Sequence, residues 1–106
     1  LFTRKGRRRM MYLLSGLPQL LFVQVVAHEW AHAWAGENCP LMREPLVREG
    51  FAEWVAYKVL HLLGAVKKTA AMEQRCGLYG DGLRKMLALE RDVGSSGVLD
   101  FCRRAE

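Results

Sequence analysis

The sequence has few cysteines and no recognisable pattern among them. The chain contains three, Cys39, Cys76 and Cys102, and none of them belongs to a CxxC pair. An odd number at this spacing argues against a disulfide framework and against a zinc site built from thiolates. Three reduced thiols are typical of an intracellular protein, so we expect a cytoplasmic location.

Internal repeats and low-complexity linkers are also missing from the sequence. A chain of 106 residues can form one hydrophobic core and is too short for two. The apolar fraction of 51% and the charged fraction of 25% are those of a globular domain. We therefore predict a single domain over residues 1–106. Because the chain begins with Leu1, it can also be interpreted as the C-terminal part of a longer protein.

Acidic residues are absent from the first nine positions, which contain five arginines and lysines. The net charge of the whole chain is +5, so residues 10–106 are neutral overall (5 − 5 = 0). Proteins that bind nucleic acid usually spread basic residues over a folded face. A single basic run at a terminus is more typical of a solvated tail, and we expect no nucleic-acid partner.

Residues 10–27 carry no charge and follow the basic run, an arrangement that resembles a signal peptide or a membrane anchor. The stretch is interrupted by Gly16 and Pro18 and continues directly into His28 and Glu29. A break of this kind does not favour a membrane span, and we expect no membrane partner.

The spacing of apolar residues predicts a mainly helical protein with one strand. Residues 9–14 (RMMYLL) form a short apolar run typical of a strand. Helical periodicity, proline starts and glycine stops predict helices at residues 17–35, 46–63, 67–76, 81–93 and 95–104. The predicted fold class is therefore α+β, mainly α, with an edge strand followed by the helices that carry the site.

Residues 28–32 read HEWAH, an HExxH motif on a segment predicted to be helical. Residues four apart lie one turn above each other, so His28 and His32 can reach one metal ion. Glu29 lies about 100° round the helix, where it can address a metal-bound water without being a ligand. By itself the motif also fits a pair of histidines that bind no metal.

Glu49 follows His32 by seventeen residues, in the segment REGFAEW. Catalytic zinc commonly takes two histidines and one glutamate and keeps a fourth position open. Helices joined by a loop of this length can pack antiparallel, and we predict one zinc ion per chain held by His28, His32 and Glu49. Gly50 has no side chain, which would allow close approach to the helix that carries the histidines.

Other side chains near the two motifs have predicted roles as well. Glu53, one turn beyond Glu49, can accept the free ring N–H of a ligating histidine and fix its tautomer. His61 is a lone histidine on an apolar face, which is typical of a structural residue. The three tryptophans are expected in the core rather than in a substrate pocket: Trp30, Trp34 and Trp54.

HExxH followed by EGxAE resembles the gluzincin metallopeptidases. Four segments together are similar to the C-terminal peptidase domain of the plant LIM-domain, ubiquitin-activated growth-regulating peptidases and their shorter bacterial relatives: GLP at 16–18, AHEWAHAW at 27–34, EG at 49–50 and YGDG at 79–82. The resemblance implies a minimal gluzincin-like core, zinc, peptide-bond hydrolysis, the ligands His28, His32 and Glu49, and Glu29 as general base. The chain has no LIM cysteine pattern and no ubiquitin-interacting helix, so ubiquitin dependence is not carried over. The family usually has glutamine at the position of Glu53, and the role of Glu53 rests on the wider gluzincin resemblance.

The predicted activity is that of a zinc metallopeptidase, an endopeptidase rather than an exopeptidase, which hydrolyses peptides or proteins with a zinc-activated water. Glu29 takes the proton of that water and passes it to the leaving amine. Tyr79 is the candidate for stabilising the oxyanion, because the turn at residues 80–82 could hold its hydroxyl over the site. Packing of the Tyr79 ring on the core is the competing interpretation, and Tyr57 is a second, weaker candidate.

Two alternatives remain open. The chain could be a catalytically inactive zinc-binding scaffold or interaction domain. It could also be a basic-tailed peptidase that acts on proteins bound to nucleic acid, with residues 1–9 making the contact. These alternatives differ from the predicted peptidase in the role of Glu29 or of residues 1–9.

Overall fold

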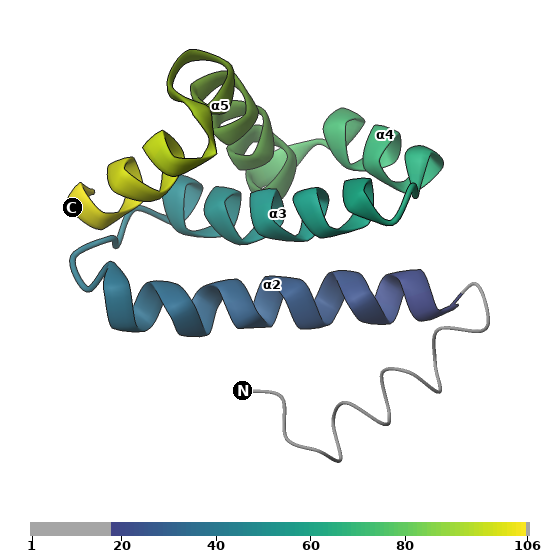
Figure 1. Cartoon of the computed structure of the whole chain (residues 1–106), viewed down its shortest axis with the longest axis horizontal. Helices are drawn as coiled ribbons and strands as arrows, with labels where there is room; N and C mark the ends of the chain where they lie inside the picture. Colours follow the sequence, from purple (N-terminus) through teal and green to yellow (C-terminus); the bar gives the residue numbers. More distant parts are fainter. Residues whose placement is uncertain (1–17, 106) are drawn as a thin grey trace.

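The computed structural model describes residues 18–105, which form four helices and no strand (Figure 1). The helices are α2 (Pro18–Asn38), α3 (Pro45–Leu62), α4 (Val66–Gln74) and α5 (Gly77–Arg104). The predicted α+β class is therefore wrong, because the described part of the chain is all-α and its helices bury their apolar faces against one another without a sheet. The predicted strand at residues 9–14 lies outside the described residues. A six-residue apolar run is also too short for periodicity to identify a strand.

The central helix of the fold is α3. It contacts α2, α4 and α5, and Figure 1 shows it running antiparallel beside α2 with α4 and α5 on its other side. All five residues from 50 to 54 are buried. Neighbours therefore cover α3 on more than one side in this stretch, and a helix of that kind does not have a single apolar stripe. The core accordingly has one layer between α2 and α3 and another between α3 and the last two helices.

Small side chains separate α2 from α3. Ala27, Ala31 and Ala35 recur every four residues along α2, and all three are buried. Side chains at a helix contact set the distance between the two axes, and alanines allow a short one. His28 and His32 each follow a buried alanine directly. The packing of the alanines therefore places both histidines beside the contact with α3.

Some of the helix ends lie at the glycines where the sequence predicts them, and others do not. Gly64 has a φ of +74° and follows α3, which is the usual place for a glycine C-cap. Gly94, with φ 76° and ψ 173°, breaks α5 into two helical parts at the predicted position. Two predicted boundaries are wrong, because α2 continues past Gly36 to Asn38 and α5 begins at Gly77 rather than at residue 81.

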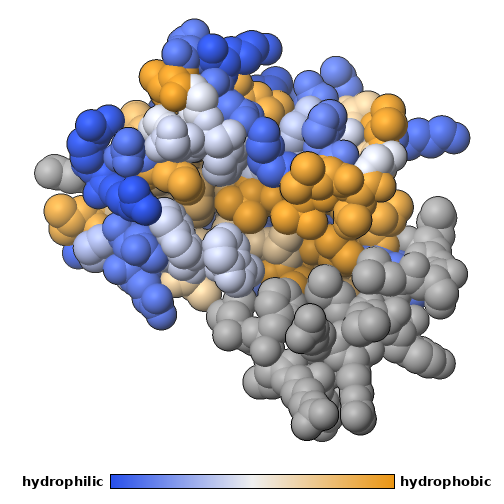
Figure 2. All heavy atoms as spheres, viewed as in Figure 1, coloured by the Kyte–Doolittle hydropathy of each residue, from blue (hydrophilic) through white to orange (hydrophobic). Residues whose placement is uncertain are grey.

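Part of the surface is apolar. Figure 2 shows hydrophobic side chains gathered where α2 and α3 lie side by side, next to the N-terminal half of α2. Large apolar side chains with high exposure include Leu21, Val25, Leu62, Leu63 and Val66. Within residues 18–105, no helix has the length and hydropathy that crossing a membrane requires.

Candidate metal centre

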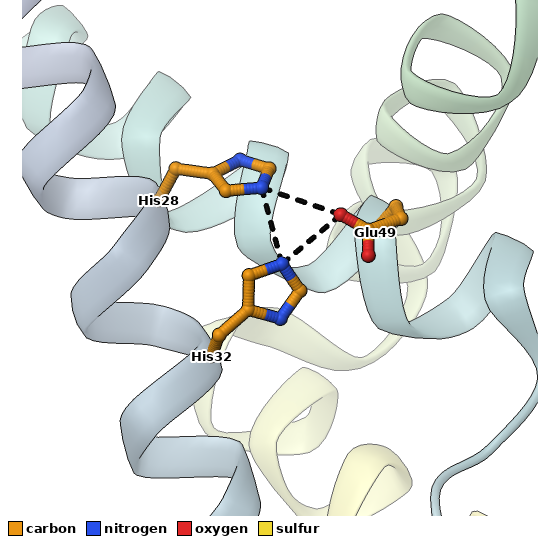
Figure 3. A group of neighbouring side chains, drawn as sticks. All are labelled: His28, His32 and Glu49. Atoms are coloured by element: carbon orange, nitrogen blue, oxygen red, sulfur yellow. Dashed lines mark hydrogen bonds and ion pairs between the residues drawn. The ribbon is translucent and has the colours of Figure 1, made fainter.

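The two histidines of the HExxH motif lie one above the other on α2. Their ring centroids are 4.8 Å apart, with an angle of 71° between the planes, and their Nε2 atoms are separated by 3.1 Å. Both Nε2 atoms point away from α2 toward α3 (Figure 3). The one-turn spacing predicted from the sequence is therefore the spacing in the structure.

Glu49 comes from α3 and completes a triangle with the histidines. Its Oε1 atom lies 3.0 Å from His32 Nε2 and 3.3 Å from His28 Nε2. The three side chains are 18%, 26% and 18% exposed for His28, His32 and Glu49, so they are shielded but open to solvent on one side. Among residues 18–105 these three form the one group of histidine, cysteine and acidic side chains arranged to hold a metal.

The dimensions of this triangle fit a tetrahedral zinc ion. Zinc binds nitrogen and carboxylate oxygen at about 2.0–2.2 Å, and two ligands at a tetrahedral angle are then about 3.3–3.6 Å apart. Of the three observed separations, 3.3 Å lies at the lower end of that range, and 3.0 and 3.1 Å are slightly shorter. Three acceptor-capable atoms this close together could hold a metal ion, and two histidines with one glutamate are a common donor set for catalytic zinc.

Glu29 is exposed and does not belong to the triangle. It lines an open pocket of about 290 Å³ beside His28, together with Leu21, Val25, Glu53, Arg75 and Tyr79. No hydrogen bond or ion pair joins its carboxylate to another residue of the described chain. Glu29 is thus adjacent to His28 and accessible to a molecule in the pocket, as the role of general base predicted for it would require.

Glu53 has a different partner from the one expected. Its side chain is buried, and Oε1 lies 3.4 Å from Nη1 of Arg75. The Oε2 atom is buried without a hydrogen-bond partner within residues 18–105. Arg75 lies in the connection between α4 and α5, and no hydrogen bond within residues 18–105 joins Glu53 to a histidine ring. The sequence pattern carried no signal for Arg75.

Tyr79 lies next to the triangle but not in the predicted turn. Residues 80–82 are helical and belong to the first part of α5, so the expected Gly-rich turn is wrong. The Tyr79 ring packs edge-on against His28 at 5.8 Å between centroids, and the Arg75 guanidinium lies 5.3 Å from the ring. Tyr79 is 40% exposed, which is not the exposure of a core residue.

Tyr57 and His61 belong to a different part of the molecule. The Tyr57 hydroxyl donates to Glu73 Oε2 of α4 at 2.9 Å, and the Tyr57 ring stacks on His61 at 6.1 Å. Burial first, and the hydrogen bond to Glu73 second, raise the pKa of Tyr57 above its usual value. Neither residue lines the pocket beside His28, and His61 is not part of the metal-binding group.

The tryptophans divide between core and surface. Trp54 is buried and donates from Nε1 to Glu90 Oε1 at 3.0 Å. Trp34 is partly buried and packs against Phe51, with 5.5 Å between ring centroids. Trp30 is 37% exposed, so the expectation that all three lie in the core is wrong for this residue.

The three cysteines are free thiols. Cys39 and Cys102 are buried, and Cys76 is exposed. Burial raises the pKa of the Cys102 thiol to about 12, with a smaller contribution from neighbouring Cys39. None of the three belongs to the group formed by His28, His32 and Glu49.

The chain matches no known protein family model, and no curated protein or solved structure is significantly similar to it.

Proposed function

We propose that this protein is a zinc-dependent metallopeptidase that hydrolyses peptide bonds. The observation that carries the proposal is the convergence of His28 Nε2, His32 Nε2 and Glu49 Oε1 at 3.0–3.3 Å from one another. The resemblance of the sequence motifs to the gluzincins, and to the plant and bacterial peptidases named above, is part of this proposal. An endopeptidase in the cytoplasm is the form of it that we favour.

His28, His32 and Glu49 would hold one zinc ion. Bound there, zinc would polarise a substrate carbonyl and supply a water that loses its proton near neutral pH. The packing of α2 against α3 through buried alanines would hold these three side chains in place before a metal ion binds. A site organised in advance in this way loses little conformational entropy on binding.

Glu29 would act as the general base. Its carboxylate is exposed beside His28 and takes the proton of the attacking water, then delivers it to the leaving amine. Tyr79 is held next to His28 by ring contact, and its hydroxyl would donate a hydrogen bond to the carbonyl oxygen as negative charge develops there. The pocket that both residues line would receive the substrate chain.

Elemental analysis of the purified protein tests the metal site. We expect about one zinc per chain in the wild type and a strongly reduced content in Glu49→Ala. A control, Glu37→Ala, removes an exposed glutamate of α2 that lies outside the metal-binding group and should leave the zinc content unchanged. Absence of zinc from a folded wild-type protein would overturn the proposal.

Peptide cleavage tests the reaction. Glu29→Gln should retain zinc, because Glu29 is not a ligand, and should lose about 10²–10⁴-fold in rate. Glu37→Gln should cleave like the wild type. Retention of zinc by a wild-type protein that cleaves no peptide in a diverse library would instead identify the inactive zinc-binding scaffold.

A further inference from the structure

A second pocket opens on the opposite side of the metal-binding triangle. It has a volume of about 300 Å³ and is lined by His32 together with Cys39, Met42, Arg43 and Arg48. The first pocket is lined by His28, the other histidine. The two pockets therefore flank the triangle, one at each histidine.

The two pockets differ in charge. The pocket at His28 contains two carboxylates, Glu29 and Glu53, and one guanidinium, that of Arg75, so its formal charge is −1 (1 − 2 = −1). The pocket at His32 contains two guanidinium groups and no carboxylate, which gives +2. A substrate that crosses the triangle meets negative charge on one side and positive charge on the other.

Both arginines of the second pocket have unused donors. Arg43 lies in the connection between α2 and α3, and Arg48 lies in the first turns of α3, directly before Glu49. Both are exposed, and neither has a hydrogen bond or an ion pair from its side chain within the described residues. The neighbouring Glu44 is engaged in capping α3, where its Oε2 accepts from the Leu46 N–H at 3.2 Å.

Arginine binds carboxylates through two parallel N–H···O bonds, and hydrogen bonds between charged groups are about twice as strong as neutral ones. Apart from the arginines and His32, the pocket is lined by apolar or small residues, among them buried Cys39 and Met42. We propose that this pocket binds a carboxylate of the peptide substrate and thereby selects acidic sequences. The proposal rests on the proposed function for its substrate, but it concerns binding and not the chemical step.

Two sources of the carboxylate are chemically equivalent at the pocket. One is the side chain of an aspartate or glutamate near the scissile bond, and the other is the C-terminal carboxylate of a peptide. The first gives an endopeptidase with an acidic preference, and the second gives an enzyme that removes short C-terminal fragments.

Binding to the Glu29→Gln protein separates recognition from cleavage. The probes are fluorescein-labelled decapeptides derived from an all-glutamine peptide. In one set, the C-terminus is amidated and a glutamate replaces the glutamine at each position in turn. The all-glutamine peptide itself is used with an amidated C-terminus and with a free one. Fluorescence anisotropy at constant ionic strength gives the Kd of each. We expect at least one glutamate position, or the free C-terminus, to bind about 10-fold tighter than the neutral amidated peptide. The position of the gain identifies the source of the carboxylate.

Variants assign the gain to the two arginines. In the Glu29→Gln background, Arg43→Gln and Arg48→Gln should each reduce the preference for the carboxylate, whereas Arg48→Lys should retain part of it. Arg91→Gln, which neutralises an exposed arginine of α5 outside this pocket, should leave the preference unchanged. Circular dichroism and zinc content show whether the variants keep their fold and site, and the Arg43 variant is informative even if Arg48→Gln disturbs Glu49. A preference that is absent, or that survives both glutamine substitutions, overturns the proposal.

Cleavage of the same peptides by the wild type distinguishes the two proposals. A protein that binds the carboxylate through Arg43 and Arg48 but cleaves none of the peptides would contradict the peptidase function and support the carboxylate site. Equal cleavage of acidic and neutral peptides, with equal binding, would support the peptidase and contradict the carboxylate site.

Discussion

Gly50 of α3 lies directly against Gly82 of α5, so the backbones of the two helices touch. A Cβ atom built on Gly50 would lie 2.6 Å from the carbonyl oxygen of Gly82, and one built on Gly82 would lie 2.6 Å from Gly50 Cα. The sequence suggested that Gly50 allows close approach to the helix of the histidines, which is α2. The close approach is instead to α5, on the other side of α3. Glu49 precedes Gly50, so this contact helps to fix the position of Glu49, the third of the proposed zinc ligands.

Replacement of Gly50 by alanine should destabilise the protein. The new methyl group meets backbone atoms that cannot rotate away, and overpacking of this kind costs about 1–3 kcal/mol. Gly36→Ala is a matched control, because a Cβ there meets nothing within 4 Å and alanine favours helix by about 0.5–1 kcal/mol. Urea unfolding followed by circular dichroism should therefore give shifts of opposite sign. Equal shifts would contradict the close contact.

Zinc should stabilise the folded protein. A metal that binds the native state and not the unfolded chain raises stability by mass action, about 2.7 kcal/mol at a free concentration 100 times the Kd. We expect Tm to fall when a chelator is added to the wild type and to rise again with excess zinc. Glu49→Ala should show a much smaller response, and Glu37→Ala the full response. The same chelator effect in wild type and Glu49→Ala would place any bound metal elsewhere.

The contact between Arg75 and Glu53 should contribute to stability because Glu53 is buried. Their side chains are 51% and 6% exposed, respectively, so Arg75→Ala leaves a buried carboxylate without its cation. An unsatisfied polar group costs about 1–3 kcal/mol, and the exposure of Arg75 to solvent places the expected loss toward the lower end. Adding Glu53→Gln to Arg75→Ala should recover part of the loss, since the charge is gone. A double variant that is less stable than Arg75→Ala alone would contradict this account.

Acid should weaken the link between α3 and α5 at Glu90. Burial raises the pKa of Glu90, but hydrogen bonds donated by Lys58, Ser95 and Trp54 together outweigh it and hold the pKa below the usual 4.5. A carboxyl group whose pKa is lower in the folded state stabilises the protein above its unfolded pKa and loses that contribution as the pH falls through the folded value. The stability difference between wild type and Glu90→Gln should therefore shrink between pH 7 and pH 3.

Asp92→Asn is the control for this titration, because Asp92 is an exposed acid of the same helix with no described hydrogen bond or ion pair. Its stability difference from the wild type should change less with pH. Urea midpoints measured across the pH range test both variants. A constant difference for Glu90→Gln would show that Glu90 has the same pKa in the folded and unfolded chains.

The local sequence was sufficient to predict some of the helix ends and the spacing of residues within one helix, because these features depend only on residues close together in the chain. Helical periodicity and glycine stops identified α3, its end at Gly64 and the break at Gly94, because backbone conformation at these positions is a property of the residue itself. The spacing of His28 and His32 follows from the pitch of any helix. The α+β class failed because a short apolar run has too few residues to show a period.

The partners of side chains that are far apart in the sequence depended on the tertiary structure. Glu49 reaches the histidines because alanines let α2 and α3 pack closely, whereas Glu53, one turn on, meets Arg75 from a connection that has no recognisable motif. Arg43 and Arg48 likewise line a pocket beside His32 only because the chain turns back between α2 and α3. The spacing of residues along the chain determines which of them share one face of a helix. The packing of the helices decides which side chains of other segments lie against that face.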